Sequence, residues 1–162
     1  MQYSADTGSS AVALSAATAK TCLMIISPST IGGELIEASV TFDGVTASNT
    51  PVLVELVKST NATNSTPGTN NTSVTPVQTR GVGNTTGNGL ASLFTAFAAS
   101  TSEPTVLTVA KRWLIPPTSG LLQQLPLGRE TEIIPSMGLG LRVTAPQTVN
   151  VRAYFEFAQS PS

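Results

Sequence analysis

Two stretches of this chain alternate strictly between apolar and polar side chains. In residues 35–43 the alternating apolar positions that follow Leu35 are Ile36, Ala38, Val40 and Phe42. In residues 149–157 they are Val149, Val151, Ala153, Phe155 and Phe157. A period of two places every second side chain on one face of a strand. The pattern therefore predicts two half-buried strands, the second more strongly than the first.

Further aliphatic or β-branched runs predict the remaining strands, which brings the expected number to about eight. These runs cover residues 21–27, 52–58, 105–115, 121–127 and 139–144, with a shorter one at 11–14. Turn-forming dipeptides such as Asp43-Gly44 and Ser119-Gly120 separate them, and the prolines fall between runs or at their starts. Many short strands divided by turns are typical of an all-β fold, and we expect an antiparallel β-sandwich of the jelly-roll kind.

One segment fits a helix as well as a strand. In residues 90–99 the apolar side chains Leu90, Leu93, Phe94 and Phe97 follow helical spacing. The Ser and Thr content of the segment weakens the helical interpretation. A short helix and a short strand both stay open for this segment.

Two regions are expected to lie outside the sandwich. Residues 1–20 are rich in Ala and Ser and are interpreted as an N-terminal arm, followed by one β-sandwich domain at 21–162. Within that domain, residues 59–89 form a long Thr/Asn-rich insertion with few apolar side chains. Such a segment alone buries too little surface to offset its ordering entropy. We expect the arm and the insertion to carry contacts between subunits.

The composition argues against most enzyme classes. The 162 residues include no histidine, one cysteine, 8 Lys+Arg and 9 Asp+Glu. General acid–base catalysis, zinc sites and nucleophile activation usually depend on histidine, clustered cysteines or paired charges. The sequence therefore favours a protein that is not an enzyme and has no cofactor, no catalytic residue and no metal ligand.

Charge and hydropathy reduce the range of expected partners and cellular locations. The net charge of −1 gives no field that concentrates phosphate, and the cations are scattered, so no nucleic-acid partner is expected. No apolar run approaches the length of about 18 residues that a membrane span needs. No basic segment precedes the Ala-rich stretch in residues 1–20, so a secretory signal is not expected.

Carboxylate pairs are the remaining candidates for hydrolysis. Glu130 and Glu132 share a face if the chain is extended, and Glu34 and Glu37 flank the start of a strand. Charges at the edge of a sheet explain both pairs equally well. Asn-x-Ser/Thr patterns begin at Asn61, Asn64, Asn70, Asn71 and Asn84. A segment rich in Asn, Thr and Ser contains such patterns through its composition alone, so they do not require glycosylation.

Single residues have simple interpretations. Cys22 lies in an apolar run and is expected to be a small buried hydrophobic residue. Trp113 follows two cations, and the alternation around it leaves a core position and an exposed sugar or protein contact both open. Residues 81–87 are rich in glycine but lack the lysine of a phosphate-binding loop, so they are interpreted as an ordinary loop.

The order of several short motifs resembles that of small structural proteins of tailed bacteriophages. The motifs are Ala17-Thr18-Ala19-Lys20-Thr21, Val40-Thr41-Phe42-Asp43-Gly44-Val45, Pro51-Val52-Leu53-Val54-Glu55-Leu56, Ser102-Glu103-Pro104-Thr105, Pro126-Leu127-Gly128-Arg129-Glu130 and Leu141-Arg142-Val143-Thr144-Ala145-Pro146. The resemblance covers most of the chain outside residues 59–89. It implies a capsid decoration, or cement, protein that acts by contact.

From this resemblance we expect a virion protein on the capsid surface, made in the host cytoplasm. Its expected partners are the major capsid protein and other copies of itself, in a homotrimer. The expected core consists of Val40, Phe42, Val54, Leu56, Val151, Phe155 and Phe157. Two alternatives stay open: a tail or baseplate accessory, or a carbohydrate-binding module that uses Trp113, Tyr3 and Tyr154 as platforms.

Overall fold

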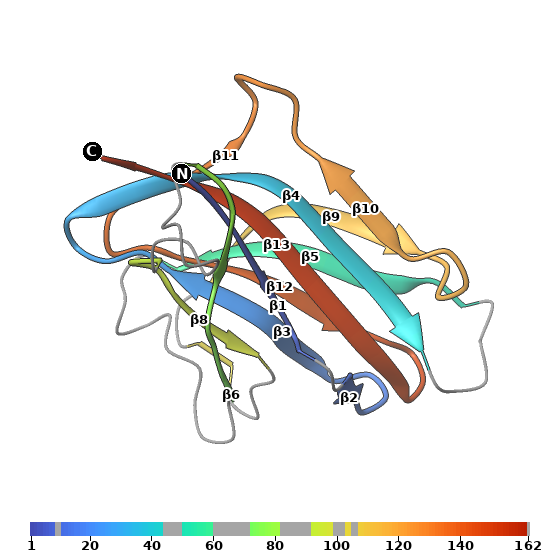
Figure 1. The fold of residues 1–162 in the computed structure, drawn as a ribbon. Coiled ribbons are helices and arrows are strands. Elements are labelled where there is room, and N and C mark those ends of the chain that lie inside the picture. The colour runs from blue at the N-terminus through green and yellow to red at the C-terminus, as the bar shows by residue number, and fades with distance from the viewer. Residues whose placement is uncertain are drawn as a thin grey trace.

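The computed structural model describes residues 1–8, 11–43, 50–59, 72–81, 92–98, 103–104 and 107–161, and their regular structure is all β (Figure 1). Within these residues there are thirteen strands and no helix. The strands are β1 (Gln2–Asp6), β2 (Val12–Leu14), β3 (Ala19–Ile26), β4 (Ile31–Asp43), β5 (Val52–Ser59), β6 (Thr72–Val74), β7 (Val77–Arg80), β8 (Thr95–Ala98), β9 (Thr108–Ile115), β10 (Leu121–Gln124), β11 (Thr131–Ile133), β12 (Gly138–Thr144) and β13 (Val149–Pro161).

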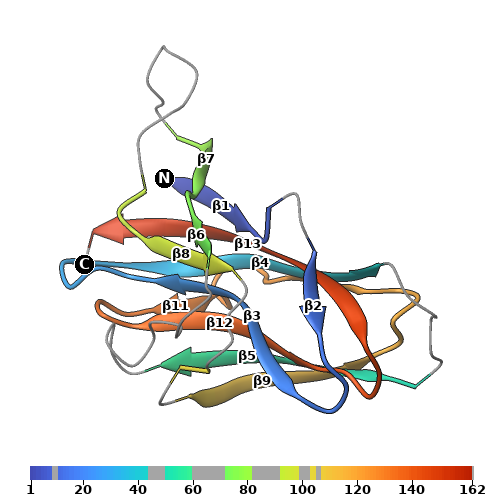
Figure 2. The ribbon, with the colours of Figure 1, turned by 90° about the horizontal axis from the view of Figure 1, so that it is seen from below.

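The strands form two antiparallel sheets. The seven-stranded sheet has the order β10-β4-β13-β1-β7, with β11 also paired to β4 and β2 also paired to β13. The six-stranded sheet has the order β6-β8-β3-β12-β5-β9. Figure 2 shows the two sheets as separate layers. The all-β, sandwich-like expectation is confirmed, whereas the described strands number thirteen rather than about eight.

The core lies between the inner faces of the two sheets. The apolar side chains of β13 that were expected to face inward, from Val149 to Phe157, are all buried. Phe157 stacks on Phe94, which lies just before β8 of the other sheet, with ring centroids 5.1 Å apart. The stack therefore joins the two layers. Of the expected core residues, Phe42 is only half-buried, and it packs against the cluster from the end of β4.

A β-bulge changes which side chain of β4 faces the core. Glu156 of β13 pairs with Glu37, but the next residue, Phe157, pairs with Leu35, so Ile36 has no partner on β13. An extra residue of this kind shifts the alternation by one position. Leu35 is therefore buried and Ile36 half-buried, which corrects the prediction that Ile36 belongs to the core face.

Both strands of the segment expected to be an N-terminal arm pair with β13 of the seven-stranded sheet. Strand β1 pairs with β13 along its whole length and with β7 on its other side. Tyr3 and Ala5 point into the core, while Gln2, Ser4 and Asp6 alternate with them. Strand β2 also pairs with β13. Strand β1 has a period-two pattern of its own, but the strand is only five residues long and contains only small or polar residues besides Tyr3.

The expected insertion at 59–89 is also partly structured. Ser59 is the buried last residue of β5, and strands β6 and β7 come from within the insertion. Strand β6 extends the six-stranded sheet next to β8, and β7 extends the seven-stranded sheet next to β1. The segment that fitted either a helix or a strand contains strand β8. Residues 60–71 and 82–91 lie outside the described part.

A turn between β10 and β11 projects from the body (Figure 1). The backbone N–H of Arg129 donates to the carbonyl oxygen of Pro126 over 2.8 Å. Gly128 has φ +80°, the left-handed value that the third residue of such a turn requires. The turn leaves Leu127 97% exposed.

Candidate functional site

The outer face of the seven-stranded sheet is a polar surface that strand register assembles from distant parts of the chain. Side chains of directly paired residues point to the same side of a sheet. The register therefore arranges the outward side chains in three rows across the strands. The first row is Leu122, Ser39, Tyr154 and Asp6; the second is Gln124, Glu37, Glu156, Ser4 and Val77; the third is Glu132, Glu34, Ala158, Gln2 and Arg80. We call these three rows the outer face.

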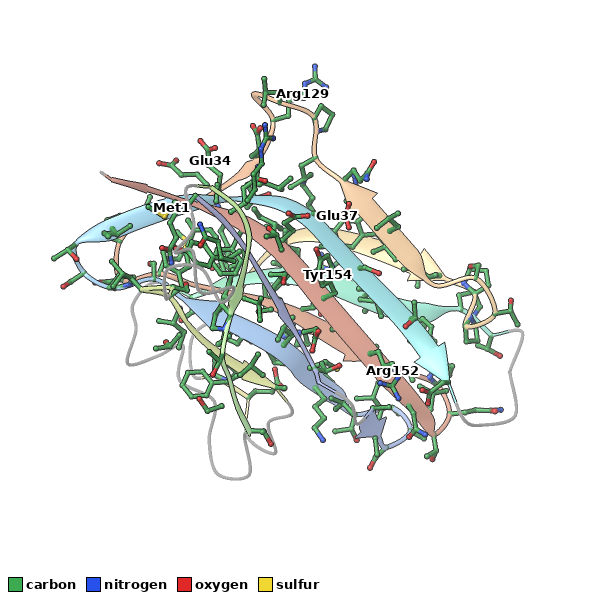
Figure 3. The ribbon with its side chains drawn as sticks, in the orientation of Figure 1. Met1, Glu34, Glu37, Arg129, Arg152 and Tyr154 are labelled. Carbon is green, nitrogen blue, oxygen red and sulfur yellow. The ribbon has the colours of Figure 1, made fainter. Side chains whose placement is uncertain are left out.

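Two pairs of glutamates lie directly opposite one another on this face. Glu37 of β4 pairs with Glu156 of β13, and Glu34 of β4 pairs with Glu132 of β11. Figure 3 shows Glu34 and Glu37 along β4, with Tyr154 beside them on β13. Like charges at directly opposite positions of a sheet repel. The two glutamate pairs therefore lower the stability of the sheet locally.

Neutral donors hold the second-row carboxylates in place. The Gln124 side-chain amide donates to Glu37 Oε2 over 2.9 Å. Glu156 accepts from the Thr79 hydroxyl on one oxygen, at 2.9 Å, and from the Tyr154 hydroxyl on the other, at 3.2 Å. These bonds fix the position of both carboxylates without neutralising their charge.

Tyr154 stands at the centre of the face. Partial burial, then the negative charge and hydrogen bond of Glu156, and lastly the charges of Glu37 and Asp6 together raise the pKa of its hydroxyl to about 12. The phenol therefore stays protonated throughout the physiological range and acts as a hydrogen-bond donor. It offers an aromatic edge beside carboxylates, which suits cationic or polyhydroxyl partners.

The candidate residues from the sequence are distributed over several places. Glu34, Glu132 and Tyr154 come together on the outer face, while Glu130 lies outside strand β11, at the end of the projecting turn. Tyr3 is buried in the core, so the prediction that it is a platform for sugars is wrong. Trp113 is half-buried and packs against the core from β9, the strand at the edge of its sheet.

A buried ionic contact around Glu55 was not predictable from the residue pattern. Glu55 on β5 is buried and receives Arg112 Nε of β9 at 2.8 Å and Arg142 of β12 at 2.7 Å, one guanidinium on each carboxylate oxygen. Burial raises its pKa, but the hydrogen bonds and charges of the two guanidinium groups outweigh burial and lower the pKa below its ordinary value. Only the register of three strands brings these residues together, so spacing in the sequence did not reveal them.

Cys22 is confirmed as a buried residue. Burial is the main cause that raises the pKa of its thiol to about 12; the charge of Lys20 partly offsets it, and the charge of Glu103 adds to it. The Glu103 carboxylate accepts hydrogen bonds from the backbone N–H and the hydroxyl of Thr21, both at 2.6 Å. A thiol with so high a pKa is neither a nucleophile nor a metal ligand at neutral pH.

The remaining sequence motifs lie mostly outside the described residues. All five Asn-x-Ser/Thr patterns begin at positions outside the described residues, and so does most of the glycine-rich stretch at 81–87. In the described part of the chain, no three His, Cys, Asp or Glu side chains are grouped closely enough to hold a metal ion. No helix in that part is long and apolar enough to cross a membrane.

Comparisons with protein-family models, with curated proteins and with solved structures each found no match. The function is therefore argued from the strand order and the outer face. That face presents carboxylates, amides, hydroxyls, one guanidinium and the apolar side chains of Leu122 and Val77.

Proposed function

We propose that this chain is a structural virion protein that binds the outside of a phage capsid and stabilises the shell by bridging neighbouring subunits. The strand order is the observation that carries the proposal. Eight strands have the order β1-β13-β4-β10 in one sheet and β3-β12-β5-β9 in the other. This order supports the jelly-roll fold that we propose for the chain.

The jelly roll narrows the range of functions when it is combined with the chain's chemistry. Double-sheet jelly rolls occur in viral capsid proteins, lectins and cupins. Cupin metal sites depend on histidine, and this chain contains none. A fold alone does not define function, so the outer face supplies the second argument. It is a wide binding surface on rigid strands, which suits a protein that acts by contact.

A clamp on a closed lattice needs only modest contacts. Each decoration subunit touches several shell subunits at once, and linked contacts add through effective concentration. The proposed partner is the major capsid protein, at the capsid surface. We also propose a homotrimer, since β9 is an edge strand with no partner on its outer side among the described strands, and Leu114 on it is exposed. Light scattering of the purified protein measures this state.

A carbohydrate-binding module, or a tail or baseplate accessory, is the second candidate. Tyr154, Gln124 and Glu37 on an open sheet face are the kinds of group that recognise sugars. If this candidate is right, a glycan array gives saturable binding that Tyr154→Ala removes. Binding to shells without binding to glycans favours the decoration role.

Co-sedimentation with undecorated shells tests the proposal. Shells assembled from the major capsid protein alone are mixed with the purified chain and pelleted, and the temperature of shell disruption is then measured. The proposal predicts saturable binding at a fixed ratio to shell subunits and a higher disruption temperature. A chain that stays in the supernatant, or that binds without stabilising the shell, contradicts it.

A further inference from the structure

The charged residues of this chain are divided between the two sheets. Every Lys, Arg, Asp and Glu lies in the described part. The seven-stranded sheet and its connections carry seven acidic and three basic residues: Asp6, Glu34, Glu37, Asp43, Glu130, Glu132 and Glu156, with Arg80, Arg129 and Arg152. The six-stranded sheet and the Glu103 contact carry two acidic and five basic residues: Glu55 and Glu103, with Lys20, Lys58, Lys111, Arg112 and Arg142. A net charge of −1 thus conceals an acidic sheet and a basic one.

Among the described residues, no ion pair involves the four glutamates of the two opposed pairs. The ion pairs of the described residues join Arg112 and Arg142 to Glu55, and Arg152 to Asp43. Lys58 Nζ donates to the backbone carbonyl of Glu132 rather than to its carboxylate. Repulsion between opposed glutamates destabilises a folded sheet, and such departures from local stability are expected at functional sites. A cationic partner on this face removes the repulsion.

Exposed apolar side chains gather on the same sheet. Leu122 ends the first row and is 63% exposed, and Val77 ends the second row and is 59% exposed. Leu127, on the projecting turn beside the face, is 97% exposed. Isolated exposed apolar residues need no explanation, but here they border a charged centre at both ends of the rows. Apolar contacts combined with unpaired charge are typical of a protein-binding surface.

We infer that the outer face is the docking face of this protein, and that its partner is a protein surface rich in lysine and arginine side chains. Glu34, Glu37, Glu132 and Glu156 are its charged contacts, and Leu122 and Val77 are its apolar ones. The inference rests on the proposed function for the identity of that partner, the capsid shell. Acidic polymers such as nucleic acid are repelled by the same face.

A paired neutralisation of charge tests this inference. In Glu37→Gln/Glu156→Gln the side-chain shape is kept while two negative charges are removed. At each position one acceptor oxygen becomes a donor amide, and the hydroxyl of Thr79 or Tyr154 is able to accept from the new amide at position 156. A matched control, Ala16→Lys/Thr118→Lys, raises the net charge by the same two units at exposed turn positions away from the outer face. Binding of all three proteins to undecorated shells is measured at low and high salt, and circular dichroism checks that each is folded.

The inference predicts that the glutamine variant binds at least about tenfold more weakly at low salt and that its affinity depends less on salt than that of the wild type. The control is expected to bind like the wild type. If the wild type binds shells and the glutamine variant binds equally well, the outer face is not the docking face and only this inference fails. If the wild type binds no shell, the proposed function fails and this inference fails with it. Loss of self-association in the glutamine variant, with shell binding intact, assigns the face to contacts between copies and also overturns the inference.

Discussion

The ring of Tyr3 stacks on the ring of Phe157, with the two centroids 6.0 Å apart. The contact joins the first strand of the chain to the last, and Phe157 continues the stack to Phe94 of the other sheet. We predict that Tyr3→Ala lowers the free energy of unfolding by about 3 kcal/mol, because it leaves a cavity in a buried aromatic cluster. Urea denaturation measures this change. A loss below about 1 kcal/mol would mean that β1 is dispensable, as an arm would be.

Glu55 makes the stability of the fold depend on pH. Its pKa is lowered in the folded state, so its contribution is complete above the ordinary value of 4.5 and is lost as the pH falls through the folded value. We predict that Glu55→Gln costs about 2 kcal/mol at pH 7, because two guanidinium groups lose their counter-charge. Chemical denaturation of both proteins at pH 7 and pH 3 measures the difference. An equal difference at the two pH values would show that the Glu55 charge contributes nothing.

Cys22 is predicted to be unreactive in the folded protein. Its thiol is buried and has a pKa of about 12, so at pH 8 only about one molecule in ten thousand holds a thiolate. Iodoacetamide followed by mass spectrometry is expected to show no modification under native conditions and complete modification in denaturant. The variant Thr118→Cys, at an exposed turn, supplies the positive control. Rapid native labelling of Cys22 itself contradicts the burial.

Gly33 is predicted to be intolerant of any side chain. A Cβ atom at this position of β4 overlaps the carbonyl oxygen of Ala158 on β13 and approaches the Phe94 ring to 3.1 Å. Gly33→Ala is expected to cost about 2 kcal/mol through overpacking, or several degrees in Tm. Gly128→Ala is the comparison, since nothing lies within 4 Å of its Cβ and only its positive φ opposes the change, at about 1 kcal/mol. Equal Tm values for wild type and Gly33→Ala would contradict the close approach.

Alternation in the sequence predicted strands well where one face of a long strand is buried. Strand β13 followed its pattern from Val149 to Phe157 without exception. In β4 the pattern failed only at Ile36, because a bulge is a property of pairing with β13 and cannot be read from one strand. Strands such as β6, β7 and β11 are three or four residues long, so they contain too few positions for a period to appear.

The outer face was not predictable as a site. Glu34, Glu37 and Tyr154 stood out as single candidates, but Glu156 and Gln124 did not. The rows exist because strands from distant parts of the chain align in one register, and a slip of one residue would send each side chain to the other face. Strand order and register therefore determine which side chains lie together on the outer face, and residue types and spacing alone do not.

The most direct test of the account is the position of this chain in a particle. Electron cryo-microscopy of shells with and without the protein, at a resolution that shows strands, locates the added density. The account predicts a two-sheet density on the outer surface of the shell that spans neighbouring capsid subunits, with the face formed by β10, β4, β13 and β1 turned toward them. Density at the tail or baseplate, or no added density at all, would contradict it.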